Sequence, residues 1–299
     1  MQKANKVISL TMGGLGNQLF CYAAARRLSI TNNAELVIDN ITGFARDRQF
    51  RRRYMLDHFH IAARMATPGE RFEPFGLYRR GLLKWFSSRK PLNERSYLEQ
   101  EGQGFDERLL QLRIKGLCYL DGYWQSEHYF KDIEQTVRED LQIIPPTDAI
   151  NMKIGAEILN RESVAIHVRW FDLLGSSTSN NIPTGYYQRA IALIEEKISS
   201  PHYFLFSDNP EAALSILTIS KERVTLVSHN KGDENAYADL WLMAQCRHFI
   251  TANSTFSWWG AWLSPFKDKV VVAPDTRQDG KTVWGFEGVV PDSWIKLPL

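Results

Sequence analysis

Apolar runs in the second half of the chain alternate with stretches of helical periodicity. Short runs rich in β-branched and aromatic residues, typical of buried strands, lie at 163–169, 202–207, 223–228, 247–251 and 269–273. Apolar residues recur at helical spacing between these runs, at 184–198, 210–219, 235–246 and 255–264. Strands that alternate with helices in this way predict a parallel, doubly wound sheet, which binds its ligands at the carboxyl ends of its strands.

The first half of the chain begins with the same alternation. Residues 7–12 (VISLTM) predict a strand, GGLGN a turn, 18–30 a helix and 35–39 (ELVID) a second strand. Residues 44–115 carry basic and aromatic clusters without a clear period, and we assign them no topology. The pair Pro145-Pro146 breaks any helix that precedes it and marks a domain boundary. We therefore expect an α/β protein of two Rossmann-like domains, 1–148 and 149–299, that face each other across a cleft.

Composition and charge narrow the class of protein. The 299 residues are 44% hydrophobic and 23% charged, as in globular proteins that bury a core without disulfides. A formal net charge of +2 gives no field that would attract a nucleic acid, so we expect no nucleic-acid partner. The three distant cysteines fit a reducing compartment, and neither a signal peptide nor a membrane-spanning apolar run is recognisable. These features predict a cytoplasmic protein.

A glycine-rich turn follows the first predicted strand. Gly13, Gly14 and Gly16 permit close approach of the backbone, and the helix that follows presents free N–H groups to an anion. The turn matches neither the dinucleotide fingerprint nor a Walker A loop. Asn17 and Gln18 place two carboxamides where a ligand would meet the turn. The alternative is a tight strand-to-helix turn that binds nothing.

Two strands of the second half end in charged groups. His167 and Arg169 share one side of the strand end, and Asp172 follows them. An arginine there suits a phosphate, because its planar fork donates two parallel bonds, although a strand-end arginine is often only a surface residue. Asp208 ends the next strand, where it either caps the following helix or binds a ribose hydroxyl or a base edge.

The segment 251–263 (TANSTFSWWGAWL) leads from a strand into a helix crowded with tryptophan. Ser254 and Thr255 stand at the helix N-terminus, where such residues cap the helix or bind phosphate oxygens. We interpret the three tryptophans as core packing, since one helix face cannot hold them all. The chain contains no D-x-D pair, so we expect no metal ion and no other cofactor.

Taken in order, GGLGNQLF, HVRWFD, FSDN and LMAQCRHFITANSTFSWWGAWL form a set that resembles the bacterial α-1,2-fucosyltransferases of glycosyltransferase family 11. The resemblance spans about residues 7–265 and implies a GT-B-like fold and an inverting, metal-independent reaction. The implied reaction moves L-fucose from GDP-β-L-fucose to O2 of a terminal β-galactose. The implied acceptor is a β-galactoside oligosaccharide or a lipid-linked glycan, in the synthesis of O-antigen or another surface glycan.

The resemblance also implies roles for residues around the donor phosphates. Arg169 resembles the arginine that grips the β-phosphate of GDP, and His167 would lie beside the nucleotide. Ser254, Thr255 and Phe256 resemble a loop on the phosphate side of the donor site.

Further roles would fall outside this phosphate site. Asp239 resembles a carboxylate that accepts from N1 and N2 of guanine. Asn17, with Gly14 and Gly16, would come from the other domain and face the fucose and the diphosphate. Together with Arg169 and Asp172, Asn17 completes the implied catalytic set.

The chain departs from the family at one motif. The usual H-x-R-R-G-D-Y is HVRWFDL here, so Trp170 replaces the second arginine and Phe171 the glycine. Asp172 is the candidate general base, or else the partner that orients Arg169. Two alternatives stay open. One is a GT-B transferase of another nucleotide sugar, such as GDP-mannose, and the other, suggested by the lost arginine, is a nucleotide- or glycan-binding protein without catalysis.

The segment 75–90 (FGLYRRGLLKWFSSRK) mixes aromatic and aliphatic residues with five basic ones. A basic amphipathic segment can lie on an anionic bilayer, where a lipid-linked acceptor would be found. The alternative is a solvated helix packed on its own domain. We therefore expect either a cytoplasmic enzyme or one held peripherally at the inner face of the plasma membrane.

Overall fold

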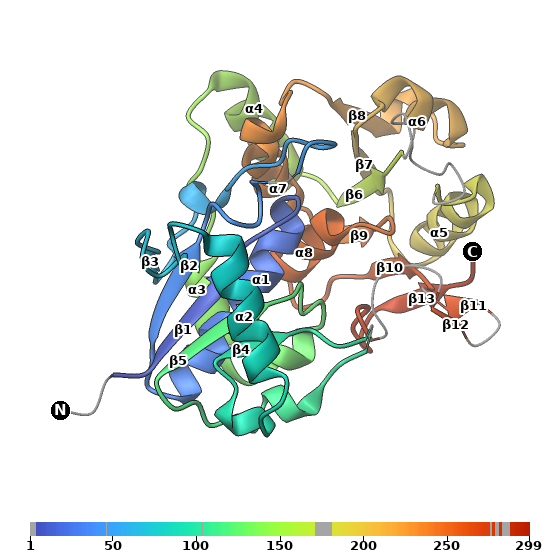
Figure 1. Ribbon diagram of the computed structural model, residues 1–299. Helices are drawn as coiled ribbons and strands as arrows, with labels where there is room; N and C mark the ends of the chain where they lie inside the picture. The colour runs from blue at the N-terminus through green and yellow to red at the C-terminus, as the bar shows by residue number, and fades with distance from the viewer. Residues whose placement is uncertain are drawn as a thin grey trace. The chain divides into compact units, whose positions relative to one another are not determined.

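The computed structural model describes residues 4–45, 47–102, 104–170, 181–275, 277–278, 281–282 and 288–299, with the backbone alone at 277–278 and 281–282. The chain divides into two compact units, Met1–Gln142 and Ile143–Leu299, drawn from blue to green and from green to red in Figure 1. The division falls a few residues ahead of the boundary expected at 148. In the described part of the chain, every helix falls short of the length or the apolar character that crossing a bilayer demands.

The first unit contains a five-stranded parallel sheet in the order β3-β2-β1-β5-β4. Its strands are β1 (Lys6–Leu10), β2 (Glu35–Asp39), β3 (Arg64–Met65), β4 (Tyr97–Glu99) and β5 (Leu117–Asp121). Its helices are α1 (Leu15–Thr31), α2 (Gly76–Ser87) and α3 (Glu134–Asp140), and 3-10 turns lie at Leu56–His58, Leu92–Glu94, Glu107–Leu109, Glu127–Tyr129 and Lys131–Ile133. The region left without topology thus supplies two short strands and one helix.

Alternating side chains of β1 pack on different elements. Ile8 and Leu10 join a buried cluster that includes Leu83 of α2. Ser9, one position out of phase, donates from its hydroxyl to the carbonyl of Cys21 in α1, at 3.2 Å. Because successive strand residues point to opposite faces, α1 and α2 cover the two faces of this sheet.

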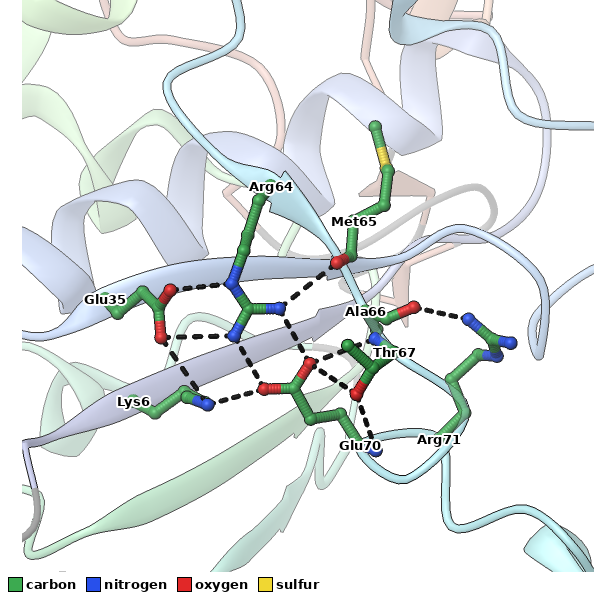
Figure 2. Close-up of polar contacts among 8 residues, drawn as sticks. All are labelled: Lys6, Glu35, Arg64, Met65, Ala66, Thr67, Glu70 and Arg71. Carbon is green, nitrogen blue, oxygen red and sulfur yellow. Dashed lines mark hydrogen bonds and ion pairs between the residues drawn. The ribbon is translucent and has the colours of Figure 1, made fainter.

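A charged network fixes the edge strand β3 (Figure 2). Arg64 contacts Glu35 of β2 and Glu70, each at 2.7 Å, and Lys6 of β1 contacts Glu70 at 2.5 Å. Thr67 donates to Glu70 from its backbone N–H at 3.0 Å and from its hydroxyl at 3.1 Å. These cations and hydrogen bonds hold the pKa of Glu70 far below its usual range. Ion pairs and hydrogen bonds, and not a run of buried apolar residues, therefore stabilise the position of β3.

The second unit contains a six-stranded parallel sheet in the order β13-β10-β9-β6-β7-β8. The strands are β6 (Ser163–Val168), β7 (His202–Ser207), β8 (Val224–Val227), β9 (His248–Ile250), β10 (Val271–Pro274) and β13 (Ile295–Leu297). A two-stranded antiparallel ribbon joins β11 (Arg277–Gln278) to β12 (Lys281–Thr282). The five strands expected in this half are all present, and β13 adds a sixth that was not predicted.

The helices of the second unit are α4 (Ala149–Leu159), α5 (Thr184–Lys197), α6 (Pro210–Ile216), α7 (Ala236–Ala244) and α8 (Thr255–Leu263), with 3-10 turns at Lys221–Arg223 and Asp233–Asn235. The four expected helices are confirmed, and each ends slightly earlier than predicted. The prediction that the α8 tryptophans form core is also confirmed, because Trp258, Trp259 and Trp262 are buried.

Two glycines bring α4 and α8 close to α7. A Cβ at Gly155 of α4 would lie 2.8 Å from the Trp241 ring, and one at Gly260 of α8 would lie 2.4 Å from Sδ of Met243. Trp241 and Met243 both belong to α7, so a side chain at either glycine would require the Trp241 ring or the Met243 side chain to shift.

The chain reverses direction across each sheet at its centre. In the second unit it runs outward from β6 through β7 to β8 and then returns to β9 on the other side of β6. In the first unit it runs from β1 through β2 to β3 and returns to β4 and β5 on the other side of β1. Ligands of open α/β sheets bind at such switch points, here the carboxyl ends of β6 with β9 and of β1 with β5.

Candidate active site

An arginine and an aspartate meet at the carboxyl ends of β6 and β7. Arg169 directly follows β6, and its Nη1 lies 2.6 Å from Oδ2 of Asp208, which directly follows β7. The other oxygen of Asp208 accepts from the backbone N–H of Trp170 at 2.9 Å. Asp208 does not cap α6, because the side chain of Asn209 accepts from the first turn of that helix. Asp208 thus orients the guanidinium that follows the central strand.

His167 lies two residues before Arg169 and is 6% exposed. Its buried Nδ1 has no hydrogen-bond partner among the described residues. Burial, with a smaller contribution from the adjacent Arg169 charge, lowers the pKa of His167 to about 3, so the ring is neutral at physiological pH. Its centroid lies 5.8 Å from that of Phe256. An unsatisfied ring nitrogen therefore stands at the switch point, next to the arginine.

The N-terminus of α8 adds backbone donors to the same edge. The register of β6 on β9 pairs Ile166 with Ile250, which brings the loop after β9 beside His167. The hydroxyl of Ser254 accepts from the backbone N–H of Phe256 at 3.3 Å, so Ser254 caps the helix while its own proton can still be donated. The first turn of a helix favours an anion.

Two hydrogen-bonded carboxamides, those of Asn230 and Asn151, extend from Asp239 of α7. Asn230 donates to Asp239 at 2.8 Å and to Asn151 at 2.9 Å, and Asn151 donates to Asp148 at 2.7 Å. Burial raises the pKa of Asp239 to about 7, and the hydrogen bond from Asn230 only partly opposes that shift. A buried carboxylate that is this costly to ionise is suited to accept hydrogen bonds from a ligand.

The sequence did not predict Asn151 or Asn230 as residues of the site. They lie 79 positions apart in the sequence and bond to each other in both directions, at 2.9 Å each. The one local signal is Asp148, which caps α4 by accepting from the N–H groups of Ile150 and Asn151. An N-cap residue in the sequence predicts where a helix begins, but it does not predict that the capped turn forms hydrogen bonds with a distant loop.

The first unit places its glycine turn at its own switch point. Gly13 has a φ of +75°, and a Cβ there would lie 2.8 Å from Nδ2 of Asn17. Gln125, which follows β5, donates to Oδ1 of Asn17 at 2.8 Å. The turn after β1 and the loop after β5 are thus joined through Asn17, while Gly14 caps α1 without a side chain.

Gln18 differs from its neighbour. It is buried, donates to the carbonyls of Gly13 and Arg53, and accepts from the N–H of Met55. Its carboxamide therefore holds the backbone together, and only Asn17 of the predicted pair remains a candidate for ligand binding.

The structure sorts the predicted residues into three groups. One edge of the second unit brings together His167, Arg169, Asp208, Ser254, Thr255 and Phe256. Asp239 belongs to the carboxamide network on α7, and Gly14, Gly16 and Asn17 lie in the first unit. Asp172 lies outside the described residues. Within the residues that the structure describes, no three His, Cys, Asp or Glu side chains gather closely enough to hold a metal ion.

Comparisons with solved structures identify the fold. A structure of the α-1,6-fucosyltransferase NodZ soaked with GDP-fucose matches with a TM-score of 0.53 and 19% identity, over 88% of this chain and 94% of NodZ. A mutant of Arabidopsis thaliana FUT1 in complex with GDP matches with a TM-score of 0.54 and 14% identity, over 90% of this chain and 70% of that one. With its two parallel sheets, the protein is therefore a GT-B-like α/β protein.

Sequence comparisons identify the family. The model of glycosyl transferase family 11 matches residues 7–297, so the chain belongs to that family. The O-antigen biosynthesis glycosyltransferase WbnK of Escherichia coli is 30% identical over 97% of this chain and 99% of WbnK. An α-1,2-colitosyltransferase of Escherichia coli is 26% identical over 97% of this chain and 98% of the relative. The protein is thus a glycosyltransferase of family 11, as its motifs indicated.

Proposed function

We propose that the protein transfers L-fucose from GDP-β-L-fucose to O2 of a terminal β-galactose, with inversion to an α-1,2 linkage. The second unit would bind the donor and the first unit the acceptor. The acceptor would be a β-galactoside oligosaccharide or a lipid-linked glycan. Membership of family 11 and the fucosyltransferase fold support this proposal.

The observation that carries the proposal is the group around Arg169. Its guanidinium is held by Asp208 beside a neutral histidine and the N-terminus of a helix, at the switch point of the sheet. When the bond between fucose and GDP breaks, negative charge collects on the diphosphate. An oriented arginine and helix N–H groups stabilise that charge more in the transition state than in the bound donor, as catalysis requires.

Asp239 would select the base of the donor. Its carboxylate would accept from N1–H and N2–H of guanine, and these donors would replace the solvation that burial removes. Asn230 already donates to one oxygen and so fixes the carboxylate in place.

The displacement itself involves the first unit. Oxygen O2 of galactose forms a bond to the anomeric carbon, and the bond from that carbon to the β-phosphate oxygen breaks, so GDP departs with the electron pair. The O2 proton would pass to Asp172, our proposed general base. Asn17, oriented by Gln125, would face the fucose and the diphosphate, with Gly14 and Gly16 allowing the backbone to approach.

A second donor is worth testing because one relative is named an α-1,2-colitosyltransferase. A protein 26% identical to this chain is thus named for a different sugar, and Trp170 marks a departure from the usual motif beside the phosphate site. The rival function is transfer of colitose, or of another nucleotide-activated sugar, by the same chemistry.

The test is a matrix of donors and acceptors. Purified protein is incubated with GDP-fucose or nucleotide-activated colitose and a panel of β- and α-galactosides, and products are analysed by mass spectrometry and NMR linkage analysis. We expect α-1,2-fucosylated β-galactosides. Products formed only from nucleotide-activated colitose would show that the transferred sugar is colitose and not fucose. Products with a different linkage would overturn the proposed α-1,2 regiochemistry. GDP binding by calorimetry without turnover of any pair would make the protein a binding module.

A further inference from the structure

Helix α2 exposes large apolar side chains. The exposed fractions are 69% for Tyr78, 51% for Trp85 and 56% for Phe86, and Phe75 just before the helix is 79% exposed. Ser87 is the only residue of the helix that is fully buried. Scattered apolar residues are normal on a protein surface, but a cluster on one short helix marks an interaction site.

The apolar residues lie opposite the contact with the sheet. Arg80 and Leu83 contact the rest of the first unit, since Arg80 donates to the carbonyl of Arg71 at 2.8 Å and Leu83 joins the buried cluster. Tyr78, Leu82 and Trp85 are spaced by four and three positions, so they share the opposite, outward face. In Figure 1, α2 is the teal helix drawn in front of the sheet of the first unit.

Basic residues surround the apolar face. The segment 75–90 contains five arginines and lysines and no aspartate or glutamate. Arg89 stacks on Trp85, with its guanidinium carbon 3.4 Å from the ring centroid, which keeps the charge on the outward side. Arg79 donates to the backbone carbonyls of Phe72 and Glu73, and Lys84 pairs with Glu99 at 2.5 Å. Glu99 thus neutralises Lys84, and Arg79, Arg89 and Lys90 give the outward face a net positive charge beside its apolar residues.

We propose that this outward face of α2 binds the surface of an anionic bilayer. Aromatic rings and aliphatic side chains enter the boundary of headgroups and acyl chains, while arginine and lysine contact lipid phosphates from the sides of the helix. A second copy of the chain is a poor occupant, because a two-fold contact through this face would oppose like charges. The inference rests on the exposure and charge of α2 and is independent of the donor proposed above.

Two variants of the full-length protein test the apolar and cationic parts separately. The first is Tyr78→Ser with Trp85→Ser, and its matched control is Ile144→Ser with Leu159→Ser, two apolar residues exposed in the second unit. The second is Arg79→Gln, Arg89→Gln and Lys90→Gln. Its matched control replaces three exposed lysines elsewhere, Lys115→Gln, Lys153→Gln and Lys197→Gln.

Binding is measured by co-sedimentation with vesicles of phosphatidylcholine alone or with one quarter phosphatidylglycerol. We expect the wild-type protein to bind the anionic vesicles and to dissociate as salt rises. Each basic residue near such a surface contributes about fivefold, so the triple Gln variant should lose on the order of 100-fold in partitioning. The double Ser variant should lose at least tenfold, and both controls should stay within twofold of wild type. Circular dichroism and thermal melting confirm that all variants fold.

Three results would overturn the proposal. Wild-type protein that does not sediment with anionic vesicles is one, and equal losses in the α2 variants and their controls are another. The third is a wild-type dimer, seen by sedimentation velocity, that the double Ser variant abolishes while vesicle binding persists. That result would assign the face to self-association.

Discussion

Arg169 and Asp208 illustrate how two adjacent strands orient one charge. Parallel pairing of β6 with β7 matches His167 to Phe206 and Val168 to Ser207, so the residues that follow the two strands meet at the same level. The Asp208 carboxylate then fixes the guanidinium through one oxygen and the Trp170 backbone through the other. If Arg169 binds the donor phosphates as proposed, a guanidinium held in this way needs little reorganisation during the reaction.

Arg169→Ala should lower kcat on the order of 10²–10³-fold, since it removes a charge stabiliser that acts mainly in the transition state. Arg169→Lys should recover only part of the loss, because an ammonium supplies charge without a planar fork. Steady-state kinetics with GDP-fucose and a β-galactoside gives the values, with Arg189→Ala of α5 as the control. An alanine variant within threefold of wild type in kcat would remove Arg169 from the mechanism.

Asp208→Asn tests the orientation of that arginine. The amide keeps the size of the side chain but loses the charge that holds Nη1. We expect a smaller fall in kcat than for Arg169→Ala, and little further loss when the two changes are combined. Fully additive losses in the double variant would show that Asp208 acts separately from Arg169.

Binding of GDP-fucose should depend on pH through Asp239. The pKa of Asp239 in the free protein is about 7, and hydrogen bonds from guanine would favour the ionised form and lower it. Below pH 7 the group must then release a proton when the donor binds. The affinity should therefore be highest above pH 7 and fall as the pH drops toward 5, by at most tenfold per pH unit.

Calorimetry at pH 5.5–8, in buffers of different ionisation enthalpy, measures both the affinity and the proton release. GDP-fucose is the suitable ligand because its diphosphate is esterified at both ends and does not titrate in this range, whereas a terminal phosphate titrates near pH 6. Asp239→Asn should abolish the pH dependence and weaken binding. A pH dependence that persists in this variant would assign it to another group.

At the scale of elements, the charged network of Figure 2 replaces an apolar core at the edge of the first sheet. The strand β3 comprises only Arg64 and Met65, both exposed, and so has no buried side chains to hold it. Glu35 and Glu70 anchor Arg64 instead, and Lys6 pairs with both carboxylates, so the network connects β3 with β1 and β2.

Glu70→Gln should destabilise the first unit by about 1–3 kcal/mol, since it leaves Lys6 and Arg64 with fewer charged partners. The folded state lowers the pKa of Glu70, so its contribution is fully present above the pKa of the unfolded chain. The contribution is lost progressively as the pH falls from that value through the lower pKa of the folded state. Urea unfolding at pH 7 and pH 3 measures this, with exposed Glu94→Gln as the control. The difference between Glu70→Gln and wild type should be smaller at pH 3 than at pH 7 but still present, because the folded-state pKa of Glu70 lies well below 3. Equal differences at the two pH values would contradict the prediction.

The elements differed in how far the sequence could predict them. Strands β6, β7 and β10 are buried on both faces, and such strands appear as continuous apolar runs that can be recognised without knowing their neighbours. In contrast, β3 and β4 have two and three residues, and their pairing depends on contacts with distant segments. No local pattern predicts an ion pair between residues as far apart as Lys6 and Glu70.

At the scale of the whole molecule, the two units share one plan, a parallel sheet with a polar turn at its central switch point. Motif order indicated this plan and the positions of the turns, because the glycine turn, His167 and Arg169 lie at or shortly after the carboxyl ends of strands that are easy to recognise. The partners of those residues were less predictable. Asp208 suits a helix cap as well as an ion pair, and only the pairing of β6 with β7 decides between them.

We expect transfer activity to continue in excess chelator. Arg169 and the N-terminus of α8 would supply the positive potential that a metal ion provides in other nucleotide-sugar enzymes. Activity is measured with and without EDTA after prior dialysis, and the two rates should agree within twofold. A loss above tenfold that manganese or magnesium restores would require a metal in the mechanism.

The close contacts of α7 with Gly155 and Gly260 have a consequence for how selectivity could change. The Gly155 and Gly260 backbones lie against the Trp241 ring and the Met243 sulfur, so a shift of α7 to accommodate a different base would require both side chains to repack. If Asp239 reads guanine as proposed, the entropic cost of placing its carboxylate is met when the chain folds and does not reduce donor affinity. Engineering toward an adenine nucleotide would then require changes at these helix contacts together with Asp239, since a new side chain at position 239 alone would keep the placement that α7 gives it.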